Sequence, residues 1–166
     1  ASSAIDIAFI AGLISPWRDR TLPVWSERVV VAYASDHSLS EQETLHWSDL
    51  QCTRIIVPLR GPGSEILSLL ASKLGRQNHR ISYQDVGLDR LLTLVGAGWG
   101  VMLALEGATG LSHHNINFRE INDATGPTLV LFHACWRETN TNPALKPMLA
   151  MFYERYPDLS GNGSKH

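Results

Sequence analysis

The stretch "LTLVGAGWGVMLAL", Leu92–Leu105, places three glycines within five residues, between a leucine-rich segment and an apolar run. A dinucleotide-binding loop has the spacing G-x-G-x-x-G, follows a strand and opens a helix. Here the spacing is G-x-G-x-G, and the glycines follow a helix-like pattern and precede a strand-like one. We interpret Gly96 and Gly98 as the left-handed end of a helix, and Gly100 as a point of close packing. This corner argues against a nucleotide-binding enzyme.

Strand and helix patterns alternate on both sides of this corner. The expected strands cover residues 5–10, 27–34, 53–59, 80–84, 100–105, 116–121 and 128–136. The expected helices cover residues 64–74, 86–97 and 143–156, with a short helical turn at 47–50. The apolar stripe of the second helix consists of Leu88, Leu91, Leu92 and Val95. The alternation predicts an α/β fold with a mainly parallel sheet.

Polar residues and glycines mark the expected helix ends. Ser64 is placed to cap the start of the first helix, and Gly75 its end. Asp85 is the expected N-cap of the second helix, and Asn142 that of the third. We expect a loop over residues 15–25 and a disordered tail over residues 158–166.

The overall composition is that of a globular protein. The chain has 166 residues, 44% of them hydrophobic and 18% charged, which is enough for a sizeable core. Its net charge of -2 is unlike the basic balance of a free-standing nucleic-acid binder. The sequence shows no signal-peptide pattern, and no apolar run reaches the roughly 18 residues that a membrane-spanning helix needs. We therefore expect a cytoplasmic location and no membrane partner.

The two cysteines fit the same compartment. Cys52 and Cys135 each lie in an apolar run, which favours buried free thiols. A reducing cytoplasm keeps such thiols free, although a disulfide between them is the alternative.

The segment "LRGPGSE", Leu59–Glu65, offers a candidate ligand site. A buried strand ends there, two glycines turn the chain, and a helix begins. Helix N-termini present free N–H groups that favour anions, and an arginine guanidinium suits a carboxylate. The candidate ligand-binding residues are Arg60, Gly61, Pro62, Gly63 and Ser64. The alternative is an ordinary strand-to-helix turn, with Ser64 as its cap and Arg60 solvated.

Catalytic and metal-binding patterns are weak in this sequence. It has no G-x-S-x-G nucleophile elbow. His113 and His114 are adjacent, so in a strand they would point to different sides and would not share a metal. We predict no catalytic residue, no metal site and no cofactor.

The glycine corner resembles the helix, corner and strand of the effector-binding domain of LysR-type transcriptional regulators, where a leucine-rich helix precedes "VAAGxGIAxxP". Other segments resemble the same domain in the same order, over about Ile5–Tyr156: "IDIAFI", "LPVWSERVVVAYASDHSLS", "LHWSDLQ" and "TLVLFHACWRETNTNPALKPMLAMF". Two prolines of the family pattern are missing. Leu105 and Glu106 replace the one after the corner, and Ser38 replaces the one in the "HPLA" segment.

The resemblance implies a fold like a type 2 periplasmic binding protein, with two α/β lobes joined by two crossing strands. Residues 1–32 would supply part of lobe one and the first crossing strand, and residues 33–127 would form lobe two. Residues 128–157 would hold the second crossing strand and the final helix of lobe one. The family's helix-turn-helix and the first segments of lobe one have no counterpart here. The chain is therefore expected to be a longer regulator truncated on its N-terminal side.

The resemblance also implies a ligand cleft between the lobes, with "LRGPGSE" facing it. Phe132 and His133 at the second crossing, and Trp17 in a lobe-one loop, become further candidate contacts. An interior histidine and a surface loop are the alternatives for His133 and Trp17. The implied partners are a small effector, taken to be an organic acid, and copies of the chain in a dimer or tetramer through the helix at residues 64–74. DNA would be contacted only by a domain outside these residues.

Two other functions remain open at this point. One is a free-standing solute-binding protein of the same fold. The other is a small α/β enzyme, which the lack of a nucleophile elbow, phosphate loop or metal cluster disfavours.

Overall fold

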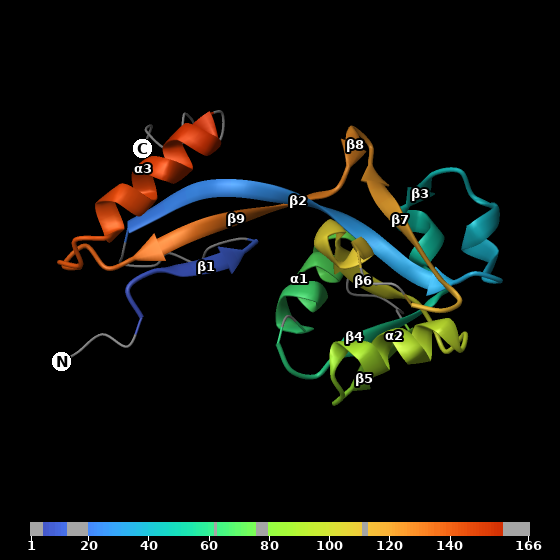
Figure 1. Cartoon of the computed structure of the whole chain (residues 1–166). Coiled ribbons are helices and arrows are strands. Elements are labelled where there is room, and N and C mark those ends of the chain that lie inside the picture. The colour runs from blue at the N-terminus through green and yellow to red at the C-terminus, as the bar shows by residue number, and fades with distance from the viewer. Residues whose placement is uncertain (1–4, 13–19, 62, 76–79, 111–112, 158–166) are drawn as a thin grey trace. The chain divides into compact units, whose positions relative to one another are not determined.

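The computed structural model describes residues 5–12, 20–61, 63–75, 80–110 and 113–157 (Figure 1). The chain divides into two compact units. Unit 1 consists of residues 1–27 and 130–166, and unit 2 of residues 28–129. Both boundaries fall within long strands, one in β2 (Arg20–Ala34) and the other in β9 (Leu129–Trp136).

Unit 1 is a small sheet covered by one helix. β1 (Ala8–Ala11) pairs antiparallel with β9, which places Ile10 opposite His133. β2 neighbours β9 in the sheet order. The helix α3 (Leu145–Arg155) packs Leu149 and Phe152 against a buried cluster of Leu22, Val24 and Ala134. Burial of apolar side chains between α3 and the sheet holds unit 1 together.

Unit 2 contains the remaining elements. Its strands are β3 (Leu45–His46), β4 (Arg54–Pro58), β5 (Arg80–Gln84), β6 (Met102–Leu105), β7 (Ile116–Asp123) and β8 (Gly126–Pro127). Its helices are α1 (Gly63–Leu74) and α2 (Leu88–Gly96), with 3₁₀ turns η1 (Ser38–Glu41), η2 (Trp47–Leu50) and η3 (Glu106–Gly110).

The strand pairing in unit 2 is mixed, so the prediction of a mainly parallel sheet is wrong. β2 pairs antiparallel with both β6 and β7, and β7 pairs antiparallel with β8 and parallel with β3. β2 carries the chain into unit 2, and within that unit β7 runs in the direction opposite to β2. The parallel pairing lies elsewhere, between β4 and β5 and in a bridge from Ile55 to Val101.

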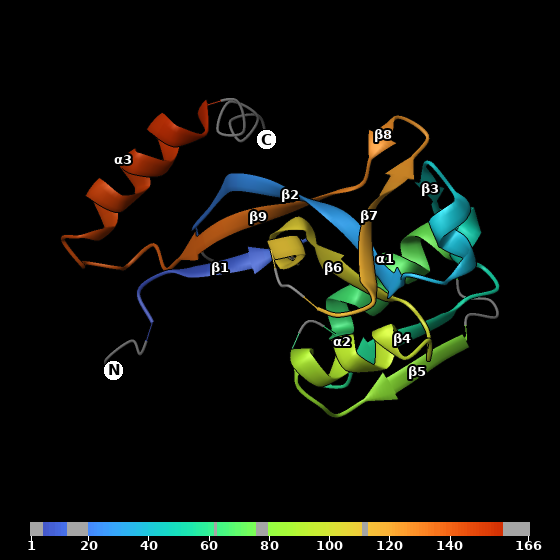
Figure 2. The same ribbon diagram turned by 45° about the vertical axis from the view of Figure 1, so that its right-hand side comes forward.

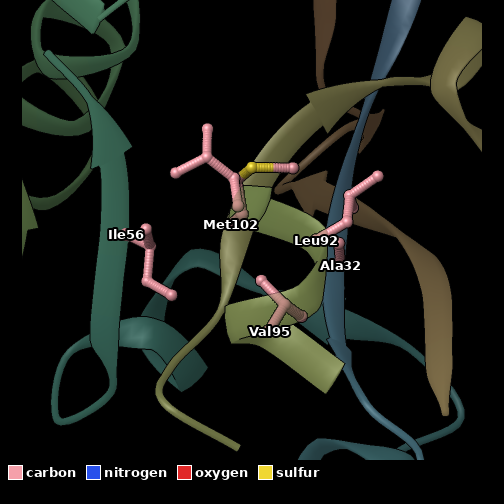
Figure 3. Packing of buried hydrophobic residues seen from close by; sticks show 6 residues of the cluster. Ala32, Ile56, Leu92, Val95 and Met102 are labelled. Carbon is pink, nitrogen blue, oxygen red and sulfur yellow. The ribbon is translucent and has the colours of Figure 1, made fainter. Parts of the chain in front are cut away.

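The core of unit 2 forms where α2 meets β2, β4 and β6. Figure 3 shows Leu92 and Val95 of α2 gathered with Ala32, Ile56 and Met102, all of them almost completely buried. This packing confirms most of the predicted apolar stripe. Leu88 is the exception, because it is the first residue of α2 and its side chain is 46% exposed.

The glycine corner after α2 behaves largely as predicted. Gly98 has a φ of +76°, in the left-handed region that favours glycine. A Cβ on Gly100 would lie 2.5 Å from the carbonyl oxygen of Arg54, the oxygen that accepts a hydrogen bond from Val101. The left-handed conformation predicted for Gly96 is wrong, because its φ is not positive. Gly96 instead packs closely, with a Cβ position 3.1 Å from the carbonyl oxygen of His114.

Several predicted boundaries also need correction. The segment at residues 20–25, predicted as a loop, is the start of β2, because Leu22 and Val24 are buried in unit 1. α3 begins two residues after Pro143, although the Asn142 side chain still accepts a hydrogen bond from the Ala144 N–H, at 2.9 Å. The predicted tail lies outside the described residues.

The two cysteines differ in their surroundings. Both are free thiols, and Cys135 is buried as predicted. Cys52 is exposed, which corrects the prediction, because it lies in the turn between η2 and β4 rather than in the buried strand that follows.

Candidate functional site

The candidate ligand residues of unit 2 lie where the parallel strands β4 and β5 end. Pro58 is opposite Gln84 in the register, and the Leu59 N–H donates to the Gln84 carbonyl at 2.9 Å. Figure 2 shows the two strands side by side. Residues that follow the strands, Arg60 on one side and Asp85 on the other, therefore share one edge. Ligands of open α/β sheets bind outside the carboxyl ends of the strands.

Two glycines let the chain turn from β4 into α1. Gly61 has a φ of +71°, and a Cβ on Gly63 would lie 2.1 Å from the Pro58 carbonyl oxygen. These positions need glycine for backbone geometry alone, whatever else they do. Pro62, the residue between them, lies outside the described residues.

Ser64 is not the cap of α1, which corrects the prediction. It lies inside the helix, and its hydroxyl donates to the carboxylate of Glu65 at 2.7 Å. This hydrogen bond, with a smaller contribution from a backbone N–H, lowers the pKa of Glu65 below its ordinary value. A carboxylate thus already stands in the first turn of α1, where the helix dipole favours negative charge. An incoming anion would have to rely on Arg60 more than on this helix terminus.

Arg60 forms a two-point ion pair with Asp85. Its Nε lies 2.7 Å from Oδ1, and its Nη2 donates to Oδ2 at 2.9 Å. The predicted N-cap role of Asp85 is wrong, because the carboxylate is turned toward Arg60. Gly87 takes the cap position of α2 without a side-chain hydrogen bond. The Arg60 side chain is 84% exposed and that of Asp85 46%, so both groups can be reached from solvent.

The other predicted contacts belong to unit 1 or cannot be placed. Phe132 stacks on Trp25, with ring centroids 4.8 Å apart, and so contributes to the packing of unit 1. Its neighbour His133 lies on the other face of β9, since adjacent strand residues alternate. Trp17 lies outside the described residues.

His133 is an interior histidine with an unmet hydrogen bond. Its Nδ1 is buried and, within the described part of the chain, has no hydrogen-bond partner. Burial lowers the pKa of His133, which favours the neutral ring. The sequence-based alternative of a fully satisfied interior histidine is therefore wrong for this nitrogen.

The structure thus brings together Arg60, Gly61, Gly63 and Ser64, and adds Asp85, which the sequence patterns had placed in a different role. The signal for Asp85 was present, since "PLR" and "YQD" both end predicted strands. Within the residues described, no three His, Cys, Asp or Glu side chains are grouped as a metal site. Across the same residues, no helix has the length and apolarity required to span a membrane.

Comparison with protein families agrees with the resemblance drawn from the sequence. A model of the LysR substrate binding domain matches residues 1–157. No curated protein sequence gives a match.

Solved structures give the same fold. The BenM effector binding domain with its effector benzoate has a TM-score of 0.70 and 20% identity, over 91% of this chain and 70% of that one. The reduced OxyR regulatory domain from Pseudomonas aeruginosa has a TM-score of 0.73 and 18% identity, over 89% and 70%. Full-length BenM E226K has a TM-score of 0.78 and 19% identity, over 92% and 51%, so the chain spans about half of that regulator. These matches confirm the predicted two-lobed α/β fold.

Proposed function

Because the chain belongs to the family of the LysR substrate binding domain, we propose that it senses a small carboxylate and so controls transcription. Arg60 would be the group that holds the carboxylate of the effector. The observation that carries this proposal is the position of Arg60, an exposed guanidinium at the carboxyl end of β4.

The chemistry of this edge supports a carboxylate ligand. A guanidinium donates two parallel hydrogen bonds to a carboxylate, and Arg60 already makes that arrangement with Asp85. The fold relative BenM is described with benzoate, itself a carboxylate, as its effector. Gly61, directly after Arg60, leaves open space where a side chain would stand. Of the two candidates on β9, His133 is kept as a proposed effector contact, because Phe132 is packed on Trp25 on the opposite face of the strand. Lobe two is taken as residues 33–127.

The proposed mechanism is a shift between lobe arrangements. An effector that binds one arrangement more tightly raises its population, and linkage carries that change to the rest of the regulator. We propose that α1 contributes to a dimer or tetramer contact, and that a DNA-binding part outside these residues reads the change. Such a regulator works in the cytoplasm, beside the chromosome.

Thermal unfolding tests the proposal. The chain would be melted with benzoate, salicylate, succinate and citrate, as wild type and as Arg60→Ala. Arg80→Ala is the matched control, because Arg80 starts β5 at the opposite edge of the same strand pair. A ligand at 100 times its Kd stabilises by about 2.7 kcal/mol, which raises the midpoint of such a domain by roughly 5–10 °C. We expect a shift for at least one acid that survives Arg80→Ala and disappears in Arg60→Ala. An equal shift in all three proteins would contradict the assignment of Arg60.

A further inference from the structure

The two-point pair of Arg60 and Asp85 occupies the Nε/Nη2 edge of the guanidinium, one of the edges through which an arginine holds a carboxylate. A guanidinium has five N–H donors, but only its flat edges present two of them in parallel to one carboxylate. Asp85 uses Nε and Nη2, at 2.7 and 2.9 Å. A ligand carboxylate that binds through this same edge must take the place of Asp85.

Asp85 is placed so that it can leave. It lies in the short link between β5 and α2, and its side chain is 46% exposed. Exposed ion pairs contribute little to stability, since water solvates both charges once they separate. In the described part of the chain the Asp85 carboxylate contacts no second cation. Its release therefore breaks no larger network.

Exposed leucines lie close in the sequence to both members of the pair. Leu59 directly precedes Arg60 and is 61% exposed, although it follows the buried strand β4. Leu88 begins α2, three residues after Asp85, and is 46% exposed. Ligand sites combine apolar walls with a few polar groups that fix orientation. A site with an exposed cation and exposed leucines on the same two chain segments suits an acid whose body is apolar.

We infer that Asp85 fills the carboxylate position when no ligand is present, and that the ligand is a monocarboxylic acid with an apolar body that displaces it. This inference rests on the proposed function and specifies the ligand class and the control of its site. A neutral analogue has no charge to compete with Asp85. A dicarboxylic acid brings a second charge toward the released Asp85, so like-charge repulsion selects against it.

Calorimetric titration of benzoate, benzamide and succinate into the chain tests the inference. The proteins are wild type, Asp85→Asn, Asp85→Ala, Arg60→Ala and the control Asp89→Asn. Asp89 lies on α2 four residues along, so its replacement makes the same charge change without touching Arg60. A melting curve for each variant shows that it is folded.

Removing the competing carboxylate and its repulsion should tighten benzoate binding about two- to fivefold in both Asp85 variants. Asp89→Asn should bind like wild type, benzamide should gain nothing, and Arg60→Ala should lose benzoate. Asp85 variants that bind no tighter than Asp89→Asn overturn the inference, and if Arg60→Ala still loses benzoate, the proposed function survives that failure. Benzoate binding that is unchanged in Arg60→Ala contradicts both the inference and the proposed function. Succinate binding tighter than benzoate, or no benzoate binding to any protein, overturns the ligand class.

Discussion

Two polar clusters lie at opposite ends of α1, and each pairs a cation with a carboxylate. Near the start of the helix, Arg60 and Asp85 form an exposed pair. In its last turn, Lys73 binds Asp123 with side chains that are only 30% exposed. Asp123 also accepts a hydrogen bond from Thr128, which in turn accepts one from Trp47 at 2.9 Å in the interior. The same chemistry therefore forms a shielded structural contact at one end and a solvent-accessible pair at the other, and burial makes the difference.

The largest expected effect is on the buried cluster. Thr128→Val keeps the shape of a side chain that is 2% exposed but leaves the Trp47 indole N–H without its acceptor. An unsatisfied buried donor costs about 2 kcal/mol, measured as the free energy of unfolding in urea. Thr125→Val, in the exposed turn before β8, is the matched control and should change little. Equal stability of the two variants would show that this cluster is no more structural than the exposed pair.

The next largest effect is expected at the exposed Arg60–Asp85 pair, and it is on ligand binding rather than on stability. Among the acids tested, the one that raises the melting midpoint most is taken for this measurement. Arg60→Ala should weaken its binding by at least about tenfold, since hydrogen bonds between charged groups are stronger than those between neutral ones. Its urea midpoint without ligand should stay that of wild type, because the pair with Asp85 is open to water. A large loss of stability in Arg60→Ala would mean that this cluster, too, is structural.

The loss in free energy of unfolding for Lys73→Ala should lie between those for Thr128→Val and Arg60→Ala. The Lys73–Asp123 pair is partly shielded from water, so its loss should cost about 0.5–1 kcal/mol in urea unfolding, and less at high salt. Lys146→Ala, on the exposed side of α3, provides the comparison. A salt-independent loss would place the contribution of Lys73 in packing rather than in charge.

The smallest effect concerns His133 of unit 1, whose buried Nδ1 has no hydrogen-bond partner among the described residues. Burial lowers the pKa of His133 in the folded state, whereas the unfolded chain takes up the proton near the ordinary value. Its contribution to stability is therefore present above about pH 6.5 and is lost as the pH falls below it. His133→Gln should flatten the dependence of the urea midpoint between pH 7 and 5, while exposed His114→Gln leaves it unchanged. An unchanged slope in His133→Gln would assign the dependence to other groups.

The local sequence pattern was enough to predict the helices and strands that bury one face. The leucine spacing of α1 and α2, the apolar run of β4 and the glycine corner around Gly98 all predicted the observed structure. Cys52 and Leu88 were misjudged because apolar neighbours in sequence do not show where an element ends. A turn exposes Cys52, and the first turn of a helix exposes Leu88.

The candidate site combines residues from two separate segments, and a local sequence pattern does not show that these segments meet. Asp85 satisfies every local criterion for a helix cap, and only the parallel register of β4 and β5 brings it to Arg60. Ser64 likewise satisfies the criteria for a cap, but the close approach of Gly63 to Pro58 starts the helix one residue earlier. Arg60 itself was identified correctly as lying at a strand-to-helix turn, because a glycine-flanked arginine after a buried strand is a local pattern.

Nuclear magnetic resonance of the Arg60 side chain tests the central claim most directly. In ¹⁵N-labelled protein, the Arg60 Nε–H would be followed while benzoate is added, alongside the amides of Gly61 and Gly63. The account predicts a saturable shift of the Arg60 signal that is larger than that of Arg80, and a greater apparent affinity in Asp85→Asn. Saturable shifts that leave Arg60 and both glycines unmoved would place the ligand elsewhere and contradict the account.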